Sequence, residues 1–375
     1  MNAKTPIGVV GCLPKLPAEF PLTYPENSGN MVHANAPLRM FDSTLYAKDI
    51  NCRLLGYRDF PDFVNKKCSH LIITLANTLK IGDADGGKYA RLSGFISKIE
   101  KPVVVFGLGV QSKSQNLSEA TLPLEAIDLV KQLSQKAHYL GVRGEYTKKV
   151  LESLCGIKNV FVTGCPSIFS NPSAFKLLRK NIANPAGRPA YAGTHYHTDV
   201  EKHLLGKAIA GDHWLIEPVN KFNHQFYLNA LTDTESSSNI PYFLKGIYKP
   251  EDDSARNTLK NYFLMRYKLF RNVEDWYQFN CDSVSFTYGS RFHVNMASLI
   301  SGKPALWFTH DARTRELVEF MNLPSVEMDS DEARNTENIF NIISYEKFFD
   351  KLPVLHGNFN HYLQANGLPK IKLEY

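Results

Sequence analysis

Short hydrophobic runs alternate with amphipathic stretches over the middle of the chain. His70–Ala76 and Pro102–Phe106 are apolar runs with the length of a buried strand. Leu124–Ala137 carries its apolar side chains at helical spacing, and Tyr139–Val142 after it is again strand-like. The alternation continues with a predicted helix and strand, Glu145–Leu154 and Asn159–Thr163. Strands that alternate with helices are typical of βαβ units and predict a buried parallel sheet.

The same alternation returns in the second half of the chain. Between the halves, Phe175–Arg188 loses strand character and ends in Asn-Pro-Ala-Gly, which favours a linker. Further strands are predicted at Ala190–Thr194, Trp214–Glu217, Ser283–Thr287 and Ala305–Thr309, and helices at Ala255–Phe270 and Arg313–Met321. We therefore predict an α/β protein of two Rossmann-like domains, residues 1–180 and 181–375, with the last helix able to cross back. The domains are expected to face a central cleft that binds ligand at the carboxyl ends of the strands.

Composition narrows the class of protein. The 375 residues include 43 Lys and Arg against 37 Asp and Glu, a net charge of +6 that is spread without a basic cluster. Nucleic acid is therefore not an expected partner. Anionic small molecules or a peripheral contact with an anionic membrane surface fit this charge, although ordinary solvated lysines are the simpler explanation. No apolar run reaches the ~20 residues of a membrane span, and the first residues lack a signal-peptide pattern. The six cysteines form no Cys-x-x-Cys pair. We expect a cytoplasmic protein, with room for peripheral contact at the inner face of the membrane.

The most informative segment begins at the predicted strand Ser283–Thr287. A turn and a helix follow the strand, and they place Arg291 and His293 in the first turn of that helix. Helix N-termini favour anions, and an arginine there is unfavourable for the helix itself. This arrangement therefore favours an anion-binding site over the alternative, a surface arginine and a histidine satisfied by backbone groups.

Arg143 occupies an equivalent place in the first predicted domain. It ends the strand Tyr139–Val142 and precedes the helix that starts at Glu145. Arg143 alone could equally form a surface ion pair. Together with Arg291 across a cleft, it would suit a ligand with two anionic groups, each bound by a guanidinium fork.

Other candidate motifs are weaker. Asn27-Ser28-Gly29-Asn30 opens a predicted helix, and its backbone N–H groups could face a ligand, although an ordinary N-cap is the simpler interpretation. Gly107-Leu108-Gly109 lacks the third glycine of a dinucleotide fingerprint. His195, His197 and His203 lack a cysteine or carboxylate that would complete a metal site, so no metal is expected. The signatures of serine hydrolases, P-loop proteins and zincins do not occur.

An ordered set of segments resembles the polysaccharide pyruvyl transferase family. The segments are Asn27–Asn30, Val142–Glu145, Val162–Pro166, Tyr288–His293, Ser301–Pro304 and His310–Thr314. The resemblance implies that Arg143, Arg291 and His293 hold or activate the donor, and that the substrate-binding residues also include Asn27, Gly29, Asn30, His310 and Arg313. Two positions depart from the family pattern: Asn30 stands where an acid is usual, and Cys165 where many members have Asp. Neither is assigned a catalytic role.

The resemblance also implies a fold and a reaction. The family has a GT-B-like fold and transfers the pyruvyl group of phosphoenolpyruvate onto two hydroxyls of a sugar, which leaves a cyclic ketal. Phosphoenolpyruvate is then a co-substrate and no cofactor is expected. The acceptor could be nucleotide-linked, lipid-linked or polymeric. Two alternatives stay open: a GT-B glycosyltransferase that uses a nucleotide sugar, and a non-catalytic carbohydrate-binding protein.

A mechanism follows from these expectations. Protonated His293 would deliver a proton to the methylene carbon of the donor, and a sugar hydroxyl would attack the resulting oxocarbenium ion. Arg291 beside it is expected to lower the pKa of His293 unless bound phosphate compensates. Candidates for the base are Glu145, Glu217 and Asp311.

Overall fold

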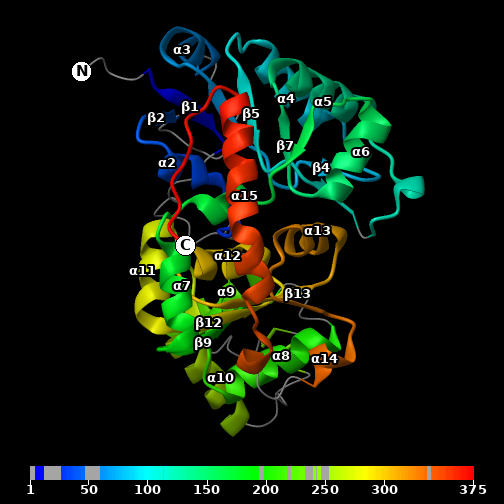
Figure 1. Cartoon of the computed structure of the whole chain (residues 1–375). Helices are drawn as coiled ribbons and strands as arrows, with labels where there is room; N and C mark the ends of the chain where they lie inside the picture. The colour runs from blue at the N-terminus through cyan, green and yellow to red at the C-terminus, as the bar shows by residue number, and fades with distance from the viewer. Residues whose placement is uncertain are drawn as a thin grey trace.

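The computed structural model contains two α/β domains that lie one above the other, as Figure 1 shows. It describes residues 5–11, 27–46, 60–112, 114–193, 198–217, 221–232, 240–241, 243–245, 253–335 and 339–375. Each domain is built on a parallel sheet, so the predicted α/β class with two Rossmann-like domains is confirmed. None of the described helices combines the length and apolar character that crossing a membrane requires.

The first domain contains a parallel sheet with the strand order β2-β1-β3-β5. These strands are β2 (Thr44–Tyr46), β1 (Ile7–Val10), β3 (Leu71–Thr74) and β5 (Val103–Phe106). A parallel bridge from Leu108 to Val142 adds β7 (Leu140–Val142) next to β5, and β8 (Val160–Val162) pairs with β7. A short parallel pair, β4 (Leu79–Lys80) and β6 (Val110–Gln111), lies beyond the end of β5. Residues of β1, β3 and β5 are buried, as expected for strands covered on both faces.

Helices cover this sheet and connect its strands. They are α1 (Asn30–Ala34), α2 (Ala36–Met40), α3 (Phe60–Lys67), α4 (Gly87–Ser97), α5 (Leu124–Lys136) and α6 (Glu145–Cys155). The predicted helix at Leu124–Ala137 corresponds to α5, whose apolar stripe at Ala126, Leu129, Val130 and Leu133 is buried. Gly156 ends α6 in the left-handed conformation, which glycine adopts without steric cost.

The second domain has a parallel sheet with the order β11-β10-β9-β12-β13-β14. Numbered within the domain, this is 3-2-1-4-5-6, the order of the Rossmann fold. The strands are β9 (Arg188–Tyr191), β10 (Trp214–Ile216), β11 (Tyr267–Lys268), β12 (Val284–Gly289), β13 (Ala305–Thr309) and β14 (Ser325–Glu327). The chain reverses its direction of winding between β9 and β12, and a crevice for ligand is expected at the carboxyl ends of these two strands.

The helices of the second domain include the two that the sequence placed next to candidate site residues. These are α12 (Phe292–Ile300) and α13 (Ala312–Met321). The others are α8 (Asp199–Ala210), α9 (Lys221–Thr232), α10 (Asp253–Arg266), α11 (Val273–Ser283) and α14 (Asp331–Arg334). The stretch predicted as a linker, Phe175–Arg188, is mostly helical: α7 (Ala174–Ala183) buries Phe175 and Leu178, so only the residues after Ala183 connect the sheets.

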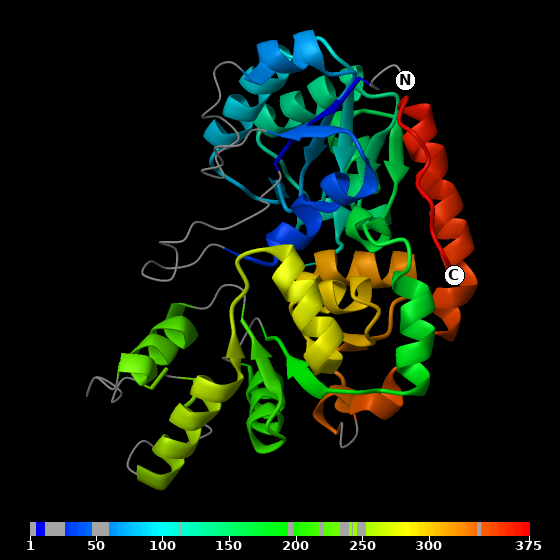
Figure 2. The same cartoon turned by 90° about the vertical axis from the view of Figure 1, so that its left-hand side faces the viewer.

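The last helix, α15 (Glu346–Ala365), runs along both domains, as Figures 1 and 2 show. Its Tyr362 hydroxyl donates a hydrogen bond to the Val105 carbonyl at 2.6 Å, at the end of a central strand of the first domain. Phe359 packs against Phe106 and Phe169, with ring centroids 5.7 and 4.7 Å apart. A hydrophobic core thus continues from one domain into the other.

Candidate functional site

A polar pocket lies between the domains, at the ends of strands from both sheets. Its lining residues are Asn27, Gly29, Asn30, Asn77, Arg143, Ser290, Arg291, Phe292, His293, Val294, Arg313 and Leu317. The set includes seven of the eight residues that the sequence predicted for the site, and they come from segments almost 300 positions apart. The pocket therefore lies where parallel-sheet proteins are expected to bind ligands.

Arg143 follows β7 and is 1% exposed. Its Nε donates to the Gly107 carbonyl at 3.0 Å, and its Nη1 donates to Asn77 Oδ1. Its Nη2 is buried and has no hydrogen-bond partner among the described residues. Burial lowers the pKa of Arg143 to about 10, so the guanidinium is still charged at neutral pH. A buried cation with an unused donor is costly unless a ligand satisfies it.

Arg291 is the residue before α12, at the N-cap position and not in the first turn as predicted. Its Nε donates to the Gly193 carbonyl at 2.7 Å, just after β9, and its Nη2 lies 3.8 Å from Glu217 Oε1. Arg291 thus lies between β9 and β12, at the point where the winding of the sheet reverses.

His293, in the first turn of α12, lies next to two residues from the first domain. Cys165 Sγ is 3.7 Å from His293 Nε2 and 3.8 Å from His33 Nδ1, and the two imidazole rings stack with centroids 5.7 Å apart. His33 lies on α1 and Cys165 after β8. Gly107, at a φ of +69°, passes so close to His33 that a Cβ there would lie 2.5 Å from His33 Cε1.

Both histidines are neutral in the unliganded protein. Burial lowers the pKa of His293 well below its ordinary value, and the charges of Arg143 and Arg313 lower it further. The sequence predicted Arg291 as the cause, so this expectation is corrected to burial and these two arginines. Burial, together with the charge of Arg143, lowers the pKa of His33 to about 3. An anion in the pocket would oppose these shifts.

His33, Cys165 and His293 are close enough for a metal site, with candidate ligand atoms all within 4.8 Å of one another. Thiolate and imidazole are ligands that Zn²⁺ prefers. The surrounding charge opposes this use, because Arg143 and Arg313 act on His293 as positive neighbours. The same charges favour an anion.

Arg313, near the start of α13, contributes a further cation. Its Nη2 lies 3.2 Å from Asp311 Oδ2, while its Nε is buried without a hydrogen-bond partner among the described residues. Arg143 Nη2 and Arg313 Nε are thus two buried guanidinium donors, one from each domain, that have no partner in the described part of the chain. Both arginines line the pocket.

The Asn27–Asn30 segment forms the pocket wall before α1. Asn27 Oδ1 accepts a hydrogen bond from the Gly29 N–H at 3.1 Å, and Asn30 is the first residue of α1. A local turn thus accounts for Asn27, but the expected side-chain N-cap is not formed, because the N-cap residue of α1 is Gly29. Asn30 is exposed and, like Gly29, lines the pocket.

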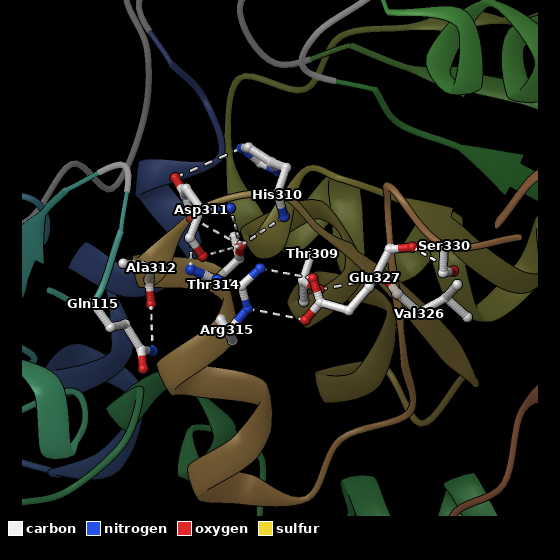
Figure 3. Close-up of polar contacts among 10 residues, drawn as sticks. All are labelled: Gln115, Thr309, His310, Asp311, Ala312, Thr314, Arg315, Val326, Glu327 and Ser330. Carbon is white, nitrogen blue, oxygen red and sulfur yellow. Dashed lines mark hydrogen bonds and ion pairs between the residues drawn. The ribbon is translucent and has the colours of Figure 1, made fainter. Parts of the chain in front are cut away.

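His310 is the one predicted site residue outside this pocket. Together with Arg291 and Arg313 it lines a neighbouring groove. Figure 3 shows His310 beside Asp311, and Asp311 accepts a hydrogen bond from the Thr314 N–H at 2.8 Å as the N-cap of α13. His310 Nε2 lies 3.6 Å from Asp311 Oδ2.

The candidate bases differ in their surroundings. Glu145 is exposed on α6 and lines neither cavity. Glu217 is 1% exposed and is held by Arg291 and by Asn223 Nδ2, which donates at 3.0 Å. Asp311 lies in the groove that also contains His310. Of the three, Asp311 is therefore the one that lines either of the two cavities.

Sequence reasoning missed two pocket neighbours, Asn77 and His33. Asn77 follows β3, so the rule that ligands bind at the carboxyl ends of parallel strands could have found it. His33 lies one helical turn after Asn30, a spacing that places the two on the same side of a helix. Of the histidines considered for a metal site, His195 and His197 lie outside the described residues, and His203 is exposed on α8.

Similarity to solved structures is distant. The chain is 12% identical to UDP-GlcNAc 2-epimerase from Methanocaldococcus jannaschii, covering 93% of this chain and 98% of the other, with a TM-score of 0.43. It is 13% identical to another UDP-N-acetylglucosamine 2-epimerase; the alignment covers 100% of this chain and 99% of the epimerase, with a TM-score of 0.43. The chain is 9% identical to a variant of the wall teichoic acid polymerase TagF. That alignment covers 87% of this chain and 76% of the polymerase, with a TM-score of 0.37. No curated protein sequence matches significantly.

Comparison with protein families gives a direct assignment. The family model described as polysaccharide pyruvyl transferase matches residues 27–312, from the Asn27 turn through the start of α13. This range contains most of the chain and every pocket-lining residue except Arg313 and Leu317, which lie just after its end on α13. The chain therefore belongs to the polysaccharide pyruvyl transferase family.

Proposed function

We propose that the protein transfers the pyruvyl group of phosphoenolpyruvate onto two hydroxyls of a sugar, and that the pocket between the domains binds the donor. The observation that carries this proposal is a pair of buried guanidinium donors on one polar pocket, Arg143 Nη2 and Arg313 Nε, for which the described residues supply no partner. Membership of the family supports the reaction class.

The donor chemistry matches the charges of the pocket. Phosphoenolpyruvate carries its carboxylate and its phosphate oxygen on the same carbon, so its two anionic groups lie close together. Arg143 comes from the first domain, and Arg291 and Arg313 come from the second. One anionic group can therefore be bound from each side, each by a planar fork of N–H donors. Neutralisation of the leaving phosphate by arginines requires no further cofactor.

His293 is the group assigned to proton transfer. In the unliganded pocket its pKa is far below the ordinary value because of burial and of positive neighbours. The negative charges of the bound donor counter these neighbours and raise the pKa toward the range that suits a general acid. Binding of the donor thus favours the protonated form of His293, which then gives its proton to that donor.

The reaction then proceeds with balanced bonds. A proton from His293 adds to the methylene carbon of the donor, and the double-bond electrons form the new C–H bond. A sugar hydroxyl attacks the oxocarbenium carbon and loses its proton. Phosphate leaves with the electrons of the C–O bond, and the second hydroxyl attacks the same carbon and loses its proton. Of the two hydroxyl protons, one replaces the proton that His293 gave and the other leaves with phosphate.

A transfer experiment tests the proposal. The protein is incubated with carbon-labelled phosphoenolpyruvate and a panel of methyl hexopyranosides and UDP-hexoses, and phosphate and labelled sugar are measured by mass spectrometry. We expect phosphate release together with label in a sugar ketal. Transfer of a hexose from a UDP-hexose, with phosphoenolpyruvate unchanged, would instead identify a glycosyltransferase.

A further inference from the structure

A second cavity opens beside the donor pocket, between the two domains. Its lining residues are Lys80, Ile81, Gln111, Ser112, Ser114, Asn116, Glu119, Arg291, His310, Asp311 and Arg313. It is open to solvent and is several times larger than the donor pocket. We call this cavity the interdomain groove.

The interdomain groove joins the donor pocket directly. Arg291 and Arg313 line both cavities, so a molecule in the groove reaches the place where the donor binds. The groove is far larger than a three-carbon donor requires. Its size and position fit the second substrate of a transfer reaction.

The wall from the first domain is built for hydrogen bonding. β4 and β6 pair with Lys80 opposite Gln111, and the buried residues of these two short strands are Leu79 and Val110. The pairing thus leaves Lys80 and Gln111 side by side and exposed. Ser112, Ser114 and Asn116 extend this wall with hydroxyl and amide groups. Such neutral donors and acceptors match the hydroxyls of a sugar.

The opposite wall contains a histidine beside a fixed carboxylate. Asp311 is held by the Thr314 N–H at 2.8 Å and by Arg313 Nη2 at 3.2 Å, contacts that lower the pKa of its carboxyl although burial opposes them. Asp311 is therefore ionised and points an oxygen to within 3.6 Å of His310 Nε2. Gln115 of the first domain donates to the Ala312 carbonyl at 3.5 Å, which ties this loop to the opposite wall (Figure 3).

We propose that the interdomain groove binds the carbohydrate acceptor, with the attacking hydroxyl beside His310, which takes its proton. The inference rests on the proposed function, and it names the site and the base for the second substrate. The hydroxyl oxygen forms a bond to the oxocarbenium carbon, and its proton moves to a ring nitrogen of His310, which passes it on to the leaving phosphate. Asp311 stabilises the imidazolium that results.

Sugar binding tests the site without turnover. Saturation-transfer NMR with the panel of methyl hexopyranosides and UDP-hexoses is measured without phosphoenolpyruvate, so that no transfer occurs, on wild type and on Lys80→Ala/Gln111→Ala. No hydrogen bond of either side chain supports the described fold, so this variant should fold normally. The control is Lys370→Ala/Gln364→Ala, the same substitutions at exposed positions near the C-terminus. We expect the sugar signal in wild type and in the control, and its loss by about tenfold or more in affinity in the groove variant.

Two results would overturn the groove assignment: equal sugar binding in the groove variant and the wild type, or no panel sugar bound by wild type. Binding of phosphoenolpyruvate, followed by thermal shift in the same samples, separates this failure from failure of the proposed function. If phosphoenolpyruvate stabilises all three proteins equally, the donor assignment stands whatever the sugars do.

His310→Gln tests the base. We expect turnover to fall by roughly 10²–10⁴-fold, while the affinities for donor and acceptor stay close to wild type. A raised acceptor KM with turnover retained would show that His310 only binds the sugar, and would overturn its assignment as base.

Discussion

Glu316 Oε1 accepts a hydrogen bond from the Thr147 hydroxyl at 2.8 Å, and Glu316 Oε2 accepts one from the Thr147 N–H at 3.0 Å. Glu316 lies on α13 of the second domain, and Thr147 lies in the first turn of α6 in the first domain. A carboxyl group from one domain thus caps a helix of the other. Gly144 makes room for this contact, because a Cβ there would lie 2.8 Å from Glu316 Oε2.

This contact fastens the segment that carries Arg143. Gly144 separates Arg143 from the start of α6, so the position of that helix determines where the guanidinium lies. Burial raises the pKa of Glu316 to about 7, although its bonds to Thr147 act in the opposite direction. The bond between the domains is therefore sensitive to pH near neutrality.

The effect of Glu316 on stability has a definite sign. Its carboxyl binds a proton more tightly in the folded than in the unfolded protein, so it contributes most at low pH, and stability falls as pH rises from about 4.5 to 7. Glu316→Gln resembles the protonated form and removes this slope. The free energy of unfolding of the variant minus that of wild type should therefore increase by up to about 3 kcal/mol across this interval. Urea unfolding at several pH values measures it, and a constant difference would mean that Glu316 titrates normally.

Arg143→Lys tests the donor clamp. An ammonium cannot reproduce the planar fork, so kcat/KM for phosphoenolpyruvate should fall by about 10²-fold. The matched control is Arg315→Lys, which makes the same substitution in a two-bond pair with Glu327 outside the pocket, at 3.0 and 2.8 Å. Thermal unfolding of both variants shows whether Arg143 serves the fold through Gly107. Equal and small losses of activity in the two variants would show that Arg143 does not bind the donor.

His293→Gln separates proton transfer from binding. The amide keeps a hydrogen-bond donor but cannot transfer a proton, so turnover should fall by roughly 10²–10⁴-fold with donor affinity nearly preserved. In wild type, turnover should decline as pH rises through the pKa of His293 in the complex, because the acid must be protonated. That limb should be absent from the residual activity of the variant. The same reaction is also run in heavy water. If the variant keeps substantial turnover and still places deuterium in the methyl group of the ketal, another residue must be the acid.

Cys165→Ser distinguishes an anion site from a metal site. Cys165 is 0% exposed and lies 3.0 Å from Ser167 Oγ, a contact that serine can keep. If the pocket works through its arginines, the variant should retain most of the turnover, and a chelator should leave wild-type turnover unchanged. Stoichiometric metal in the wild type, lost from Cys165→Ser together with turnover, would show that the His33–Cys165–His293 cluster holds an ion.

The sequence pattern predicts the fold well because local periodicity and strand order are linked in parallel sheets. The alternation of strand and helix patterns after His70 and again after Arg188 is enough to predict two parallel-sheet domains. The junctions of strand and helix then place Arg143 and Arg291 at the carboxyl ends of the strands. β1 was missed, since its apolar run at Ile7–Val10 has no helix pattern beside it to indicate a βαβ unit. The structure makes it an internal strand between β2 and β3.

For the site, the sequence predicted only which segments of the chain meet there. The stacking of His33 on His293 and the capping of Thr147 by Glu316 depend on contacts between residues more than a hundred positions apart. No local pattern encodes such contacts. The pKa of His293 illustrates the consequence, because the charges that lower it come from both domains.

Calorimetric titration of phosphoenolpyruvate into the wild-type protein tests the central claim most directly. The buried, unpartnered donors of Arg143 and Arg313 predict one binding site per chain, with affinity that weakens as salt increases and that falls in Arg143→Lys but not in Arg315→Lys. Absence of binding to phosphoenolpyruvate, or equal binding by the two variants, would contradict the assignment of this pocket as the donor site.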